Sequence, residues 1–168
     1  MISSAVRTAV SVTLMMVVAG CAGPSKVSDL PLGESAISIL DGDRTSRRYT
    51  FYVRKPDGKW FYGGGESAFE RKAPDPLEVT EKDRTSMADA MRRAGWLNGG
   101  PFTEKGSGPR FLEVSISGKP ISRRFTVLAT GGSFDPGTEE VMSLLRKVSE
   151  RRFQGVLDAL PKARPAGP

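Results

Sequence analysis

The chain has 168 residues, with 25 Lys and Arg against 19 Asp and Glu, a formal net charge of +6, one cysteine and no histidine. The lack of histidine excludes Ser-His-Asp and Cys-His catalysis, as well as zinc sites that need an imidazole ligand. A lone cysteine excludes an internal disulfide, so apolar burial must stabilise the fold. The basic excess favours anionic neighbours, although we expect most of it to be solvated surface.

The N-terminal segment places an apolar stretch between a positive start at Arg7 and a run of small residues. That run ends at the only cysteine, in the sequence Val18-Ala19-Gly20-Cys21. As a helix, the apolar residues 8–18 would extend only about 17 Å, well short of a bilayer core of about 30 Å. A lone cysteine can also be a buried or reactive thiol. Its place after small residues instead predicts a cleaved signal sequence.

This segment resembles the signal sequence of bacterial lipoproteins. The resemblance implies that Val18, Ala19 and Gly20 are recognised by a signal peptidase and that Cys21 becomes the lipidated first residue. Cys21 would then carry a diacylglyceryl thioether and an acylated amino group. At about 0.8 kcal/mol per buried methylene, two or more acyl chains hold a protein stably on a membrane. We therefore expect a cell-envelope protein. Ala22 in place of Asp favours the outer membrane, facing the periplasm, if the source has two membranes.

The composition divides the chain into four segments. Residues 1–20 form the expected lipoprotein signal peptide, and 21–34, rich in Gly, Pro and Ser, form the lipidated N-terminus and a flexible tether. Residues 35–160 are expected to fold as a single α+β domain, which is long enough to bury its own core. The Pro-rich segment 161–168 is expected to be a disordered tail.

The first half of the domain carries signals for strands and a hairpin. A short strand is expected over 35–40, ended by a turn at Asp41-Gly42-Asp43. Alternating residues predict a strand over 48–54, and the turn signal Pro56-Asp57-Gly58 predicts that 60–62 returns as its hairpin partner. The alternation assigns one face of the 48–54 strand to Tyr49, Phe51 and Val53 and the other to Thr50, Tyr52 and Arg54.

Two prolines, Pro74 and Pro76, then predict a loop without a regular ladder. A helix is expected to begin at Thr80 and to end at Gly95, where a left-handed cap is easiest. A shorter helix would instead be capped by Thr85 or Ser86. The apolar face of this helix consists of Met87, Met91 and Ala94.

The second half repeats this order, with a strand over 111–117, a turn over 117–120, a returning strand over 121–129 and a long final helix. Asp135 or Thr138 begins that helix, and Pro161 stops it. Its apolar positions recur at helical spacing: Val141, Leu144, Leu145, Val148, Phe153, Val156, Leu157 and Leu160.

This order predicts an α+β fold of two ββα units that form a four- or five-stranded antiparallel sheet with two helices on one face. In the order of elements, residues 48–160 resemble small secreted domains such as the emfourin-type protease inhibitors. The resemblance implies inhibition of a secreted protease as an alternative function. It carries over no functional residue.

Three carboxylate pairs are the remaining candidates for acid–base chemistry. They are Glu139-Glu140, Asp41 with Asp43, and Asp75 with Glu78. Acidic residues are common at helix N-termini and in turns, so a structural role is favoured for all of them. We assign no catalytic residue and expect no metal and no cofactor. A carboxylate or oxygen-liganded metal enzyme remains the least favoured class.

Basic doublets and aromatic residues are the candidates for a binding surface. This surface comprises Arg47, Arg48, Trp60, Tyr62, Arg123 and Arg124. Structural roles are favoured over binding for these residues: the charges protect strand edges and the rings pack in the core. No nucleic-acid motif is present. We expect a non-catalytic interaction module that binds another envelope protein or an anionic cell-wall component. An open edge at Trp60–Tyr62 would favour addition of a peptide strand.

Overall fold

The computed structural model describes residues 32–98, 106–119 and 121–159. The expected signal peptide, Cys21, most of the tether and the C-terminal tail lie outside these residues. The elements follow in the order β1 (Ala36–Asp43), β2 (Arg48–Arg54), β3 (Trp60–Gly64), α1 (Glu66–Phe69), β4 (Asp75–Leu77), α2 (Glu81–Arg93), β5 (Arg110–Ser117), β6 (Arg123–Leu128) and α3 (Pro136–Ala159).

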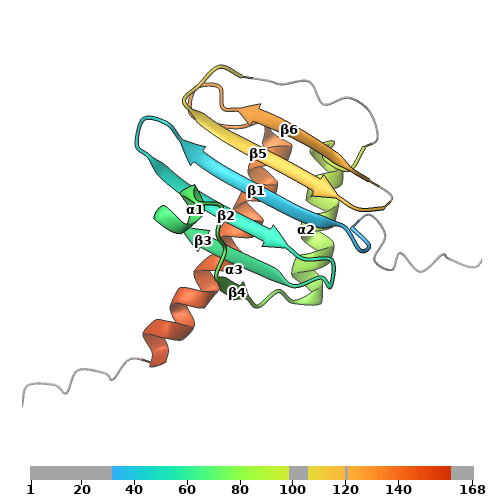
Figure 1. Cartoon of the computed structure of the whole chain (residues 1–168), viewed down its shortest axis with the longest axis vertical. Helices are drawn as coiled ribbons and strands as arrows, with labels where there is room; N and C mark the ends of the chain where they lie inside the picture. Colours follow the sequence, from blue (N-terminus) through green and yellow to red (C-terminus); the bar gives the residue numbers. More distant parts are fainter. Residues whose placement is uncertain (1–31, 99–105, 120, 160–168) are drawn as a thin grey trace, which may run out of the picture.

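The strands form one antiparallel sheet in the order β4-β3-β2-β1-β5-β6 (Figure 1). The first strand, β1, lies in the middle, between the β2–β3 hairpin and the β5–β6 hairpin. An antiparallel α+β fold was therefore predicted correctly. The expected counts of four or five strands and two helices were too low, because the described residues form six strands and three helices.

One face of the sheet is covered by α2 and α3 (Figure 1). We call it the helix-covered face. Alternate strand residues, such as Ile39 on β1 and Leu112 on β5, point into this layer and meet Met87 and Leu145 from the helices, all of them at most 1% exposed. The predicted alternation of 48–54 is confirmed, since Tyr52 joins this core while the neighbouring residues on β2 face away from it.

The opposite face, which we call the open face, carries a much smaller apolar cluster. Leu40, Phe51 and Phe111 pack there with Ala68 from the single-turn helix α1. This helix packs on β2 and β3, and no described helix lies on the same face of β5 and β6 (Figure 1). The open face is therefore apolar beneath α1 and uncovered beside it.

Both long helices begin as the sequence predicts. The Thr80 side chain accepts a hydrogen bond from the backbone N–H of Asp83, whose carboxylate accepts one in return, so the two form a capping box. Gly95 follows the end of α2 with a φ of 77°. At the start of α3 the Asp135 carboxylate accepts from the N–H of Thr138. Of the apolar positions predicted for α3, Val141, Leu145 and Val148 are buried, whereas Phe153 is 49% exposed. The side chains of Val156 and Leu157, and Leu160 as a whole, lie outside what the structure describes.

The prediction of a turn at Asp41-Gly42-Asp43 is wrong, because β1 continues through Asp43. Gly42 serves packing instead: a Cβ there would lie 2.5 Å from Cζ of Phe111, so only glycine leaves room for that ring. The chain turns after Asp43, whose carboxylate accepts from the N–H groups of the next turn, Thr45 and Ser46.

The prediction of a loop around Pro74 and Pro76 is also wrong. Residues 75–77 form β4, a short strand on β3 in which Pro76 stands opposite Phe61. A proline is tolerated there because β4 is an edge strand, and one side of it needs no donors. The strand covers the edge of β3, so Trp60–Tyr62 does not offer the open edge that would favour addition of a peptide strand.

Candidate functional site

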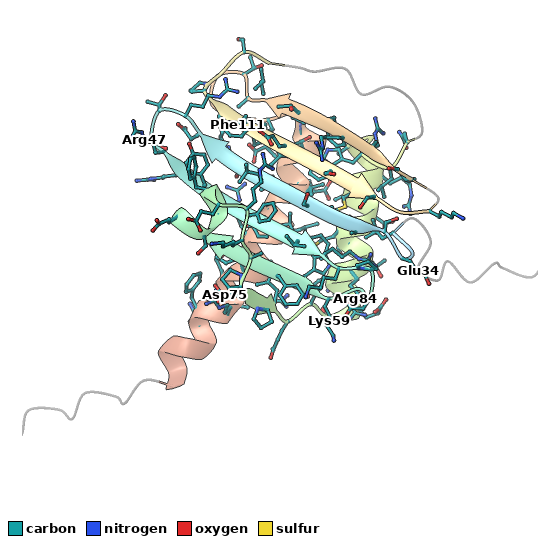
Figure 2. The ribbon with its side chains drawn as sticks, viewed as in Figure 1. Glu34, Arg47, Lys59, Asp75, Arg84 and Phe111 are labelled. Carbon is teal, nitrogen blue, oxygen red and sulfur yellow. The ribbon has the colours of Figure 1, made fainter. Side chains whose placement is uncertain are left out.

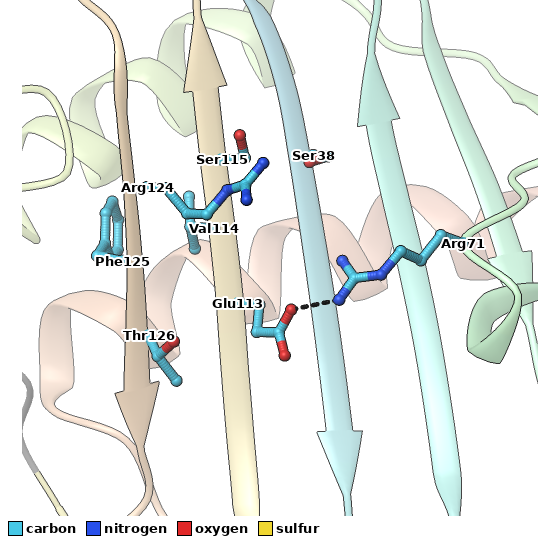
Figure 3. A pocket seen from close by; sticks show the side chains of 8 residues that line it. All are labelled: Ser38, Arg71, Glu113, Val114, Ser115, Arg124, Phe125 and Thr126. Carbon is cyan, nitrogen blue, oxygen red and sulfur yellow. Dashed lines mark hydrogen bonds and ion pairs between the residues drawn. The ribbon is translucent and has the colours of Figure 1, made fainter.

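The uncovered part of the open face contains a shallow pocket of about 380 Å³. We call it the open-face pocket. It is lined by Ser38, Arg71, Glu113, Val114, Ser115, Arg124, Phe125 and Thr126 (Figure 3). Val114 and Phe125 belong to the core of the other face, so the side chains that face a ligand here are polar or charged.

Strand register brings these polar residues together. Ser38 on β1 stands opposite Ser115 on β5, which stands opposite Arg124 on β6. Glu113 and Thr126 form the next cross-strand pair on the same face. Side chains directly opposite on antiparallel strands are about 5 Å apart. The pocket is therefore a row of two hydroxyls and a guanidinium, with a carboxylate and a third hydroxyl beside it.

Arg71 forms one wall of the pocket, from the segment after α1. Its Nη2 lies 2.6 Å from Oε2 of Glu113, so its side chain crosses the sheet (Figure 3). Its φ is 58°, a conformation that L-residues other than glycine rarely adopt. The next residue, Lys72, packs closely on β3: a Cβ added to Gly63 would overlap the carbonyl oxygen of Lys72. The fold thus tolerates local strain of about 1–3 kcal/mol where Arg71 enters the pocket.

The charge of the pocket follows from these contacts. Arg71 compensates Glu113, with which it forms an ion pair. Arg124 is exposed, and within the described residues no carboxylate lies close enough to pair with it. Two guanidinium groups against one carboxylate leave a net charge of +1. The pocket is therefore suited to a single negative charge near Arg124.

The arginine doublets predicted as one basic surface do not converge. In the strand register, Arg48 stands opposite Asp43, at one end of β1. Arg124 lies at the same level as Ser38, near the other end of β1. Five residues of strand separate the two levels, about 16 Å. Arg47 lies in the turn at that distant end (Figure 2). The prediction therefore holds for Arg124 as a pocket residue and not for a shared surface.

Arg123 points away from Arg124, because neighbouring strand residues face opposite sides of a sheet. Its guanidinium donates to the carbonyl oxygens of Gly95, Trp96 and Asn98, just beyond the end of α2. These carbonyls would otherwise lack partners at a helix C-terminus. Arg123 therefore binds the end of α2 to the sheet and is no part of the pocket.

Trp60 and Tyr62 do not form the exposed aromatic platform that was considered for them. Trp60 is only 2% exposed and lies in the core under the helices. Tyr62 is partly buried and meets Tyr52 edge-to-face, with ring centroids 5.4 Å apart. Large rings are stabilised more by burial than by exposure, and the favoured prediction of core packing is correct for both residues.

Most of the carboxylates considered for catalysis form structural contacts. Asp41 and Glu139 both bind Arg110, at 3.1 Å and 3.2 Å. Burial alone would lower the pKa of Arg110, but these two carboxylates raise it above its ordinary value. Asp75 pairs with Arg152 on α3 at 2.7 Å. Across the described ranges, no cluster of three His, Cys, Asp or Glu residues could hold a metal ion.

Comparisons with known proteins add no assignment. No protein-family model matches this chain. A search of curated proteins finds no significant match. Within the described part of the chain, no helix has both the length and the hydropathy needed to cross a bilayer. The function must therefore be argued from the residues themselves.

Most of the residues that line the pocket were not predicted from the sequence. The alternation over 111–117 implies that Glu113 and Ser115 share a face of the strand, so the sequence does indicate that these two residues lie together. The central position of β1 brings Ser38 beside Ser115, and no local pattern specifies it. The approach of Arg71 depends on α1, an element that the sequence analysis did not predict.

Proposed function

We propose that this protein is a bacterial envelope lipoprotein, anchored through Cys21, whose domain is a non-catalytic binding module. The anchoring half of the proposal is supported by the order of the N-terminal segment, with small residues directly before the only cysteine. The binding half rests on one observation: Arg124 has no ion-pair partner among the described residues and stands in a row with Ser38 and Ser115.

The chemistry of the pocket supports binding over turnover. A serine becomes a nucleophile only when a base lies within hydrogen-bond reach to remove its proton. The carboxylate that lines this pocket, Glu113, forms an ion pair with Arg71 at 2.6 Å, and among the described residues it forms no hydrogen bond to either serine. Ser38 and Ser115 are therefore better suited to donate and accept hydrogen bonds than to attack a substrate.

The position of the pocket supports a role close to a membrane. Ser38 is the third residue of β1, which follows directly on the expected tether, 21–34. In Figure 2, Glu34 and Lys59 lie at this end of the sheet and Arg47 at the other. A fully extended tether of this length reaches about 50 Å at most. The ligand is therefore expected in the same envelope layer, within that distance of the anchoring membrane.

The anchoring half is tested by Cys21→Ser in intact cells. The variant is expected to lose its lipid and to accumulate as unprocessed precursor, while the domain gives the same circular dichroism as the natural chain. Labelling with a radioactive fatty acid and fractionation of membranes measure this. A Cys21→Ser protein that is lipidated as before would contradict the proposal, as would a natural chain recovered in the cytosol with residues 1–20 attached.

The binding half is tested by cross-linking in intact cells, followed by mass identification of what is attached. A partner is expected to be captured by the natural protein and reduced for Arg124→Gln. The matched control is Arg48→Gln, which removes an exposed arginine from the other end of the sheet. Equal capture by all three proteins would show that the open-face pocket is not the binding site.

The alternative is an inhibitor of a secreted protease, suggested by the resemblance to emfourin-type domains. One observation favours it: Phe69 on α1 is 65% exposed, and exposed aromatic residues often dominate protein–protein contacts. The purified protein is then expected to inhibit secreted proteases without being cleaved, and Phe69→Ala to weaken that inhibition. Retention of full inhibition by Phe69→Ala would argue against this surface.

A further inference from the structure

We propose that the open-face pocket binds an acidic saccharide, through a sugar carboxylate at Arg124 and neighbouring hydroxyl groups at Ser38 and Ser115. This inference rests on the proposed binding function and names the class of ligand. Three features of the pocket support it: the net charge, the spacing of the hydroxyls and the ion pair between Glu113 and Arg71 (Figure 3).

The charge selects a monoanionic group. Arg124 is the guanidinium that lacks a carboxylate partner within the described residues, and the pocket carries a net charge of +1. A guanidinium binds a planar carboxylate through two parallel N–H···O bonds, which fixes its orientation as well as its position. A single carboxylate therefore matches this pocket in both charge and geometry.

The hydroxyls select a ligand with polar atoms around that carboxylate. Ser115 lies one strand from Arg124, and Ser38 lies two strands away. Neighbouring strands are about 4.8 Å apart, so the row extends about 10 Å from the bound charge. Serine hydroxyls both donate and accept hydrogen bonds, as sugar hydroxyls do. The row therefore suits one or two sugar rings better than an apolar peptide side chain.

Glu113 makes the pocket selective against more highly charged ligands. Its Oε2 binds Arg71 at 2.6 Å, and a carboxylate has further lone pairs that can accept from a ligand hydroxyl. Because Glu113 cancels the charge of Arg71, only one positive charge is left for a ligand, and a second negative charge on the ligand would have no partner in the pocket. An unpaired charge of this kind is one way in which a binding site rejects a competing ligand. Phosphate and phosphorylated sugars are therefore expected to bind less well than sugars with a carboxylate.

The test uses the lipoprotein isolated from membranes and purified in detergent with ¹⁵N label at 0.15 M salt. Cellobiouronate, a disaccharide with one carboxylate, is titrated as the acidic saccharide, maltotetraose as a neutral one and inorganic phosphate as a second anion. Amide shifts of Ser115 and Thr126 report on the pocket. We expect saturable shifts with cellobiouronate only. Saturation by maltotetraose or phosphate at equal concentrations would overturn the proposed specificity.

Variants separate this site from general attraction by a basic protein. Arg124→Gln is expected to weaken cellobiouronate binding by about tenfold, because it removes a charge-assisted pair. Arg48→Gln lowers the net charge equally and is expected to leave the affinity within about twofold, since exposed charges more than a Debye length apart are screened. Equal loss in both variants would overturn the proposal in favour of diffuse attraction.

A third variant tests the role of Glu113. Glu113→Gln leaves Arg71 without its carboxylate and raises the net charge of the pocket to +2. This variant is therefore expected to bind inorganic phosphate more tightly than the natural chain does, whereas Arg124→Gln is not. Unchanged phosphate affinity of Glu113→Gln would contradict the proposed selectivity. The two proposals fail in different ways: if cross-linking in cells depends on Arg124 but cellobiouronate does not bind, the protein is a binding module whose ligand is not an acidic saccharide.

Discussion

The two faces of the sheet meet different demands. On the helix-covered face, Ile39, Leu112 and Leu145 are fully buried, and apolar residues continue across the strands of the hairpins. On the open face, the smaller apolar cluster reaches β5 at Phe111, and Ser115 and Arg124 lie further along the uncovered strands. Stability is therefore supplied mainly by the first face. The second face is free to carry polar residues that folding does not need.

The largest expected difference between the faces lies on one strand, β5. Leu112→Ala removes a side chain that is 0% exposed and is expected to lower the free energy of unfolding by about 2–5 kcal/mol. Ser115→Ala, three residues further on and facing the pocket, is expected to change it by less than about 0.5 kcal/mol. Urea titration measures both. Similar losses of unfolding free energy in both variants would contradict the inference that the helix-covered face supplies most of the stability.

Neighbouring glycines on β3 give the next largest contrast. Gly63→Ala would force a methyl group into the backbone of Lys72 on the open face, so we expect a loss of about 1–3 kcal/mol from overpacking. Gly64→Ala instead meets the hydroxyl end of Tyr62, which can move, and should cost less. Thermal unfolding compares the two. A smaller loss for Gly63→Ala would show that the segment around Arg71 is not held tightly on the sheet.

The helices that cover the first face are joined by Asp83, which caps α2 and binds Arg151 of α3 at 2.5 Å. Burial raises the pKa of Asp83, but hydrogen bonds from Arg151 and Thr80 outweigh it and bring this pKa to about 2. Because this lies below the ordinary value of 3.8, the stabilisation is complete above about pH 4 and is lost as the pH falls towards 2.

Removing this carboxylate tests whether the helices form one layer. Asp83→Asn is expected to lower the free energy of unfolding by about 1 kcal/mol at pH 7, as loss of a helix cap does. It should also flatten the loss of stability between pH 4 and pH 2. Arg151→Gln should shift that loss to higher pH, since the first contributor to the low pKa is removed. An unchanged pH profile in both variants would exclude the proposed link.

Local signals explain which parts of the fold were predictable. Alternation over 48–54 and the cap at Thr80 act within a few residues, and the structure confirms both. Gly42 was misassigned to a turn because its role depends on Phe111, which is distant in sequence. The short strand β4 was missed because a proline is disfavoured in strands in general, and only its place at the sheet edge makes it acceptable.

The pocket was less predictable than the fold, because it is made by pairing between distant strands. The sequence analysis included Arg124 but grouped it with Arg47 and Arg48, which lie at the other end of the sheet. Ser38 and Ser115 gave no local signal, since serine on the solvent side of a strand is ordinary. A site formed by register can be inferred only once the strand order is known.

The smallest expected effect on stability belongs to Arg124 itself. No hydrogen bond or ion pair holds its side chain among the described residues, so Arg124→Gln is expected to change the free energy of unfolding by less than about 0.5 kcal/mol. The same substitution should reduce ligand binding. A loss of binding without a loss of stability would indicate that Arg124 serves the ligand and not the fold. If Arg124→Gln instead lowers the midpoint of thermal unfolding by several degrees, the guanidinium stabilises the fold, and its position in the pocket needs no ligand to explain it.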